Sequence, residues 1–118
     1  MPRSLQAYLW DIQRATADIL SFTSGKHLAD YENDAMLRAA VERNFEIIGE
    51  ALSQAIRFFP HVGARVTDEQ QIISFRNRLI HGYATVRHAL VWEIVQTKLP
   101  QLQEEVAQLL REASESSG

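Results

Sequence analysis

The sequence contains no cysteine among its 118 residues, which excludes disulfide bonds and zinc sites built on thiolates. No apolar run approaches the roughly 20 residues that a membrane-spanning helix needs. The N-terminus also lacks the basic-then-apolar pattern of a secretory signal. His27, His61 and His88 lie at no spacing that makes a metal site with carboxylates. We therefore expect a cytoplasmic protein without a membrane segment, a metal ion or another cofactor.

Acidic residues are absent from one long stretch of the chain, Gln70 to Trp92. This stretch contains Arg76, Arg78 and Arg87 and carries a charge of +3, whereas the whole chain carries −3. A cationic segment on an acidic protein indicates an anion site, and both RNA and a nucleotide phosphate fit it. The overall acidity argues against a protein that coats duplex DNA, which would need many spread phosphate contacts.

Apolar residues recur at helical spacing along the whole chain, and no strand-like alternation occurs. We therefore predict an all-α fold, an up-and-down bundle of four to five helices, in a single domain of residues 1–113. The polar segment 114–118 is expected to be a disordered tail. The predicted helices cover Leu5–Phe22, Asn33–Phe59, Asp68 to Ile80 or His81, Val86 to a break at Leu99-Pro100, and a fifth segment through Leu109.

Single residues mark the expected helix ends. Gly25 is predicted to cap the first helix and Pro60 to stop the second. Gly49 lies inside the second helix, where glycine costs about 1 kcal/mol relative to alanine, so we expect a neighbouring helix to approach closely there. Thr67-Asp68-Glu69-Gln70 has the form of a capping box for the third helix, and Gly82 is its predicted stop.

The segment Arg76-Asn77-Arg78-Leu79-Ile80-His81-Gly82-Tyr83 combines groups that suit metal-independent RNA cleavage. That reaction needs a base for the 2′-OH, a cation for the phosphoryl oxygens and an acid for the departing 5′ oxygen. The unperturbed pKa of His81 suits acid or base work near neutral pH. Arg76 offers a planar fork of donors that matches a phosphate. Asn77 could orient a neighbour, and Tyr83 could stack on a base or donate its hydroxyl.

Spacing alone leaves the role of this segment open. Arg76 and His81 are five residues apart, which separates them by about 140° on an ideal helix. They converge more easily if the helix ends before His81, or if two copies of the segment face each other across a dimer. In the structural alternative, His81-Gly82 is an ordinary helix end and Tyr83 is a core aromatic. Judged by spacing alone, that alternative is favoured.

These residues resemble the signature of the HEPN superfamily, and within it of the HepT-like toxins. The signature is Arg, a polar residue, any three residues and His, matched by Arg76–His81, and the HepT subgroup adds one residue and Tyr, matched by Gly82-Tyr83. Residues Ala40–Leu52 are similar to the second helix of the family. Residues Leu90–Leu102 are similar to its fourth helix and the break that follows.

The resemblance implies a helical-bundle homodimer whose facing motifs form a metal-independent endoribonuclease cleft. It assigns catalysis to Arg76 and His81 and a supporting role to Asn77. It also implies a partner, a small nucleotidyltransferase antitoxin of the MntA type, which inhibits the toxin by transferring AMP to Tyr83. Negative charge added there would compete with an RNA phosphate for the same cation.

Three residues outside the signature, Arg78, Arg87 and His88, are candidates for contacts with the RNA backbone. Two other functions stay open besides the toxin-type endoribonuclease. The chain could be a non-catalytic helical binding partner or substrate of a small nucleotidyltransferase, or a purely structural homodimer.

Overall fold

The computed structural model describes residues 3–80 and 87–117. Across these residues the regular structure is helical, without strands, as the apolar spacing predicted. None of the described helices is both long and apolar enough to cross a membrane. The seven helices within this part of the chain are α1 (Leu5–Thr23), α2 (Leu28–Glu32), α3 (Ala35–Phe58), α4 (His61–Arg65), α5 (Glu69–Ile80), α6 (His88–Thr97) and α7 (Leu99–Ser117).

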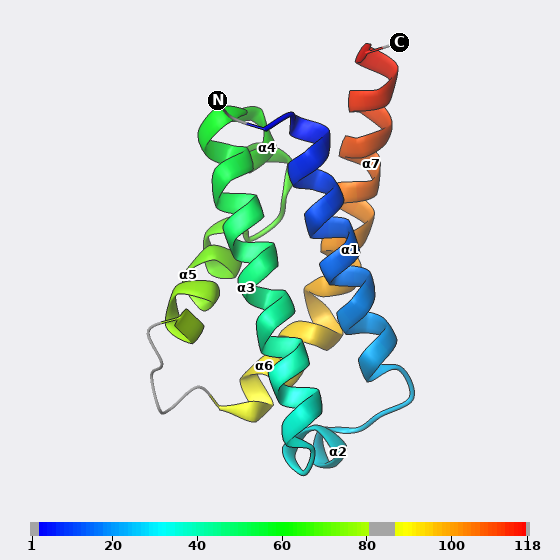
Figure 1. Cartoon of the computed structure of the whole chain (residues 1–118), viewed down its shortest axis with the longest axis vertical. Helices are drawn as coiled ribbons and strands as arrows, with labels where there is room; N and C mark the ends of the chain where they lie inside the picture. The colour runs from blue at the N-terminus through cyan, green and yellow to red at the C-terminus, as the bar shows by residue number, and fades with distance from the viewer. Residues whose placement is uncertain (1–2, 81–86, 118) are drawn as a thin grey trace.

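The long helices run up and down along the long axis of the molecule (Figure 1). Helix α3 returns antiparallel to α1 and lies between α1 and α5, while α7 packs on α1. The short helix α6 leads into α7, and together they form the last ascending limb. The predicted all-α, up-and-down arrangement is therefore confirmed, with each long helix in contact with its neighbours in the bundle.

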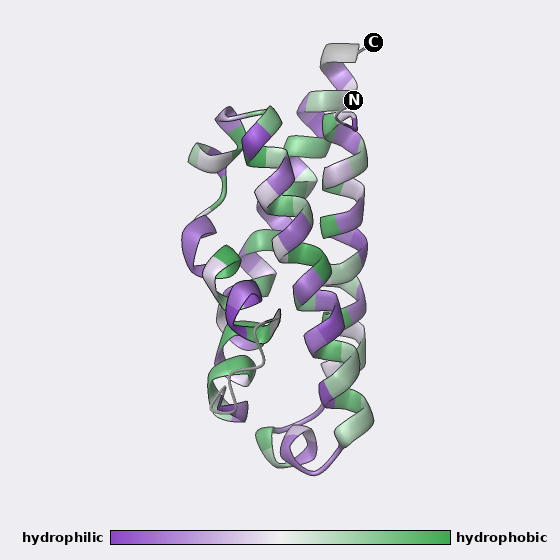
Figure 2. Ribbon diagram, turned by 60° about the vertical axis from the view of Figure 1, so that its left-hand side comes forward, coloured by the Kyte–Doolittle hydropathy of each residue, from purple (hydrophilic) through white to green (hydrophobic). Residues whose placement is uncertain are grey.

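The core lies where the apolar stripes of α1, α3 and α7 meet, with a smaller contribution from α5. Along each long helix, hydrophobic residues alternate with hydrophilic ones at helical period (Figure 2). This amphipathic pattern explains why the helices could be predicted, because burial of one face stabilises each helix. Fully buried members include Leu9, Ile12, Ile19, Val41, Ile48, Leu52, Leu99 and Val106.

Two short helices were not predicted, so the expected count of four to five helices was too low. Helix α2 falls in the turn after Gly25, whose positive φ of 73° confirms it as the end of α1. Helix α4 falls in the expected connection after Pro60. Each has five residues, too few to display an apolar period.

The two ends of the final limb differ in how well they follow the prediction. The predicted break at Leu99-Pro100 is confirmed, since α6 ends at Thr97 and α7 begins at Leu99. Helix α7 continues to Ser117, so helix occupies most of the segment 114–118 for which the polar composition predicted disorder. Extending a helix that already exists costs far less than starting one, which explains the extra turn.

The predicted capping box at the start of α5 is wrong. The Thr67 hydroxyl donates to the Glu105 carboxylate of α7 at 2.7 Å, and the Thr67 backbone N–H donates to it at 3.0 Å. Asp68 takes a positive φ of 57°, and its carbonyl accepts the Gln71 N–H at 3.0 Å as the helix begins. A tertiary contact therefore replaced the local hydrogen bond that the sequence pattern favoured.

Two ion pairs anchor the segment before α5 to the final limb. Arg65 pairs with Glu112 of α7 at 2.5 Å, which lowers the pKa of that carboxyl from 4.5 to about 2. Asp68 pairs with Lys98 at the junction of α6 and α7. These contacts fix where α5 starts, and α5 then carries the Arg76 segment along α3.

Helix α5 crosses α3 at Gly49, as the position of this glycine predicted. A Cβ atom at Gly49 would lie 2.2 Å from the Cβ and 2.5 Å from the Cγ of Arg76. Real side chains do not approach so closely, so only glycine admits the stem of Arg76 at this point. The absent side chain of Gly49 thus sets the distance between α3 and α5.

We predict that Gly49→Ala lowers the stability of the fold although it improves helix propensity. Alanine gains about 1 kcal/mol in a helix interior, but overpacking a tight contact costs about 1–3 kcal/mol, so a net loss of up to about 2 kcal/mol is expected. Urea unfolding followed by circular dichroism measures the difference.

The matched control is Gly63→Ala in α4, where a new Cβ would lie 3.7 Å from Ile56, an ordinary van der Waals contact. That variant should be neutral or more stable. Equal stabilisation by both substitutions would contradict the close-approach role of Gly49.

Candidate functional site

Arg76 is held by side chains on both sides of its guanidinium group. One terminal nitrogen, Nη1, donates to the Asn77 side-chain oxygen at 2.9 Å, and the other, Nη2, donates to the Glu50 carboxylate of α3. The Arg76 side chain is 24% exposed, so it is partly withdrawn from water but still reachable. The structure thus brings the predicted pair Arg76 and Asn77 together and adds Glu50.

The donors of Arg76 are only partly used. The Nε atom is buried and no described residue accepts from it. Each terminal nitrogen carries two N–H groups, and Glu50 and Asn77 take one each. No hydrogen bond to another described residue uses the remaining two. This arrangement leaves a planar pair of donors that suits two phosphoryl oxygens.

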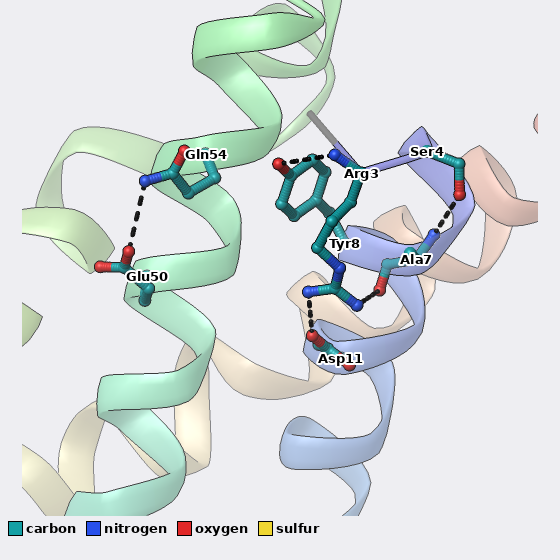
Figure 3. Close-up of polar contacts among 7 residues, drawn as sticks. All are labelled: Arg3, Ser4, Ala7, Tyr8, Asp11, Glu50 and Gln54. Carbon is teal, nitrogen blue, oxygen red and sulfur yellow. Dashed lines mark hydrogen bonds and ion pairs between the residues drawn. The ribbon is translucent and has the colours of Figure 1, made fainter. Parts of the chain in front are cut away.

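Glu50 of α3 is a contact of Arg76 that the sequence pattern did not predict. One carboxylate oxygen of Glu50 accepts from Arg76. The other accepts from the Gln54 side-chain amide at 3.3 Å, one turn along α3, and Figure 3 shows this second contact. The sequence offers Glu42, Glu46 and Glu50 as an evenly spaced ladder that resembles a solvated helix face. Nothing in that spacing distinguishes the one carboxylate that meets Arg76.

A hollow of about 430 Å³ lies beside Arg76, between α1 and α3. Figure 3 shows its α1 wall, where the Arg3 guanidinium donates to Asp11 at 2.6 Å and to the Ala7 carbonyl at 3.2 Å. Because each cation has a carboxylate partner, the hollow has no net charge. The three ion pairs that line it are Arg3–Asp11, Arg43–Glu46 and Arg76–Glu50.

Arg78 and Arg87 lie near each other on a different side of α5 from Arg76. They line a common hollow of about 390 Å³ together with Leu90 and Glu93. Arg76 and Arg78 are two residues apart on a helix, so they face nearly opposite directions. The cationic stretch seen in the sequence is therefore divided, in space, into a held arginine on the α3 side and an exposed pair on the α6 side.

His88 points toward a different environment. Its ring packs edge-on against the buried Tyr31 ring, with 5.9 Å between ring centroids, and Trp92 lies against the same ring at 5.7 Å. Burial raises the pKa of the Tyr31 hydroxyl, and the nearby Glu42 raises it further. His88 thus contributes to the contact between α2 and α6, although its residue is largely exposed.

Two predicted site residues, His81 and Tyr83, lie outside the described residues, as does the predicted helix stop Gly82. Helix α5 is described as far as Ile80. Within residues 3–80 and 87–117, no three His, Asp or Glu side chains gather as a metal site would require. The chemistry that the described residues support is electrostatic: a fixed guanidinium that can bind a phosphate and stabilise charge growing on it.

A family of ribonucleases matches this chain over most of its length. The family model described as "Ribonuclease HepT-like" matches residues 12–58 and 65–109, which include Gly49, Glu50 and the whole Arg76–Tyr83 segment. The chain belongs to the HepT-like ribonuclease family. The resemblance found in the sequence is therefore confirmed at the level of the family.

Relatives of similar length accompany the family match. "Putative RNase MJ1380" of Methanocaldococcus jannaschii is 34% identical over 88% of this chain and 94% of its own length. "Probable ribonuclease HepT" of Thermococcus cleftensis is 32% identical over 86% of this chain and 92% of its own length. "Putative RNase TTE0752" of Caldanaerobacter subterraneus is 29% identical over 88% of this chain and 92% of its own length. No solved structure matches the chain significantly.

Proposed function

We propose that this chain is a metal-independent endoribonuclease, the toxin of a toxin–antitoxin pair, with Arg76 and His81 as its catalytic residues. The observation that carries the proposal is the guanidinium of Arg76, which is held by two side chains with donors left for a phosphate. Its occurrence in a chain of the HepT-like ribonuclease family makes an RNA phosphate the natural ligand.

The proposed reaction is an internal transfer at one phosphodiester. A base removes the proton of the 2′-OH, the 2′ oxygen bonds to phosphorus, and the bond from phosphorus to the 5′ oxygen breaks. An acid gives its proton to that 5′ oxygen, so the products are a 2′,3′-cyclic phosphate and a 5′-OH. Arg76 meets the negative charge that grows on the phosphoryl oxygens, and Asn77 fixes one of its nitrogens.

A homodimer completes this site in our proposal. One histidine cannot act as base and acid in the same step, since the two roles need opposite protonation states. Two copies of the Arg76–Tyr83 segment facing each other supply two histidines and two arginines. Each protomer then provides half of the cleft.

We predict that His81→Ala abolishes RNA cleavage and growth arrest while the helical fold and oligomeric state persist. Loss of a general acid or base costs about 10²–10⁴-fold in rate. Cleavage of a labelled RNA by the purified variant, with size-exclusion chromatography for its assembly, measures both properties. The control is His61→Ala on α4, at the opposite end of α5 from Ile80, which should cleave at the wild-type rate (Figure 1). Undiminished cleavage by His81→Ala would refute the assignment.

Two exposed arginines that are not signature positions of the motif, Arg78 and Arg87, are proposed to hold the RNA backbone. Arg78 and Arg87 line one hollow together with Glu93, and among the described residues neither forms an ion pair such as the one between Arg76 and Glu50. His88 stays a candidate for the same role, because it follows Arg87 directly. Such contacts add affinity without reading the base sequence.

We therefore predict that the double substitution Arg78→Gln/Arg87→Gln weakens binding of single-stranded RNA and flattens its salt dependence. The plot of log K against log salt has a negative slope, and each lost phosphate contact makes that slope less steep by about 0.7. Loss of both contacts should therefore make it less steep by about 1.4. Titrations in the non-cleaving His81→Ala background measure this slope. Arg14→Gln/Arg57→Gln, which removes the same charge from α1 and α3, is the control. An unchanged slope would exclude both residues as backbone contacts.

Regulation is proposed to act on Tyr83 through an MntA-type nucleotidyltransferase antitoxin. The Tyr83 hydroxyl oxygen attacks the α-phosphorus of ATP, a new oxygen–phosphorus bond forms, pyrophosphate leaves and the phenolic proton is lost to a base. The attached AMP adds negative charge to the motif segment. That charge would compete with RNA for Arg76.

Incubation with such an enzyme and ATP should add AMP to Tyr83 and stop RNA cleavage, as followed by mass spectrometry of peptides and by the cleavage assay. Tyr83→Phe removes only the acceptor oxygen, so it should cleave RNA and resist inhibition. An adduct on another residue would refute Tyr83 as the acceptor. Modification of a wild-type chain that never cleaves RNA would instead favour the non-catalytic substrate of a nucleotidyltransferase.

A further inference from the structure

We propose that Glu50 is a positioning residue for Arg76, and that Gly49 and Glu50 together form the seat in which α3 holds this arginine. The proposal rests on the proposed ribonuclease function for its consequence in catalysis. The seat itself is a matter of packing and hydrogen bonds between described residues.

The first element of the seat is space. The stem of Arg76 runs where the Cβ of any residue other than glycine at position 49 would lie. The Arg76 side chain therefore lies directly against the backbone of α3. This packing alone restricts the conformation of the Arg76 side chain, independently of the hydrogen bonds that its guanidinium makes.

The second element is a short chain of hydrogen bonds. Gln54 donates to one oxygen of Glu50 at 3.3 Å, and the other oxygen accepts from Nη2 of Arg76. Nη1 of Arg76 then donates to Asn77 at 2.9 Å. Two acceptors on different helices thus hold the two ends of the guanidinium fork, which fixes its plane.

The third element of the seat is the negative charge of the Glu50 carboxylate. The Arg76 side chain is 24% exposed and its Nε atom is buried, so the guanidinium loses part of its hydration, and a carboxylate partner offsets that loss. The Glu50 side chain is itself 51% exposed, so water can still solvate it when a phosphate approaches Arg76. The pair therefore orients the arginine without closing it off from a ligand.

Positioning and simple charge balance predict different effects for three substitutions of Glu50. Glu50→Gln keeps an acceptor oxygen at the same reach, Glu50→Asp keeps the charge but shortens the reach, and Glu50→Ala keeps neither. For a positioning residue, we expect kcat to fall least in the Gln variant and about 100-fold in the Ala variant, with Asp close to Ala. KM for RNA should stay unchanged or fall, because a negative charge near the substrate is lost in Gln and Ala.

Other outcomes overturn the proposal. If Glu50 merely balances charge, the Asp variant behaves as wild type; if it only competes with RNA, Gln and Ala cleave faster than wild type. If it only stabilises the fold, unfolding shifts while kcat does not. The control is Glu42→Gln, which removes the same charge two turns earlier on α3 and should leave kcat unchanged.

A second readout separates failure of this proposal from failure of the proposed function. In the ¹⁵N-labelled wild-type protein, the terminal N–H signals of Arg76, assigned by their loss in Arg76→Lys, should be resolved because the guanidinium does not rotate freely. In Glu50→Ala the guanidinium should rotate freely, so the terminal N–H signals of Arg76 should merge into an averaged signal. In Glu42→Gln they should stay resolved. Averaged N–H signals of Arg76 in the wild type would refute the proposed seat, whether or not the protein cleaves RNA. Resolved signals in a protein that does not cleave RNA leave the seat intact and overturn the proposed function.

Discussion

The contact between Gly49 of α3 and Arg76 of α5 determines the geometry of this side of the molecule. It sets how closely the two helices approach, and so where the second half of α5 lies. The ion pairs before α5 fix its beginning, Asp68 with Lys98 among them, so both parts of the helix are located by other elements. A cation for catalysis has to be placed to within a fraction of an ångström, and rigid helices provide such precision better than loops do.

The crossing of α5 over α3 also explains how a cationic segment is accommodated on an acidic helix bundle. Helix α3 presents a ladder of carboxylates, and α5 crosses it so that one of them meets the most buried arginine of the motif. Arg78, two residues later, faces the opposite direction and shares its hollow with Arg87. One side of α5 therefore carries a fixed cation that is paired with a carboxylate, whereas Arg78 on the other side is exposed.

The sequence predicted the features that repeat along a helix and missed those that depend on one contact. The long helices, the break at Leu99-Pro100 and the close approach at Gly49 each follow from periodicity or from a residue with a special backbone. The short helices α2 and α4 have too few residues for any period. The Thr67 pattern failed because Glu105, distant in sequence, offered a better acceptor. Glu50 could not be told from Glu42 or Glu46, since only the fold decides which carboxylate α5 crosses.

The described histidines all lie away from the hollow beside Arg76. His88 packs against Tyr31 at the α2 end of the bundle, and His61 lies on α4 at the other end of α5. Neither lines the hollow beside Arg76, whose described lining contains no histidine. The described carboxylates that line this hollow are each paired with an arginine. Because none of the described histidines lines this hollow, our proposal assigns both proton transfers to His81, one from each protomer.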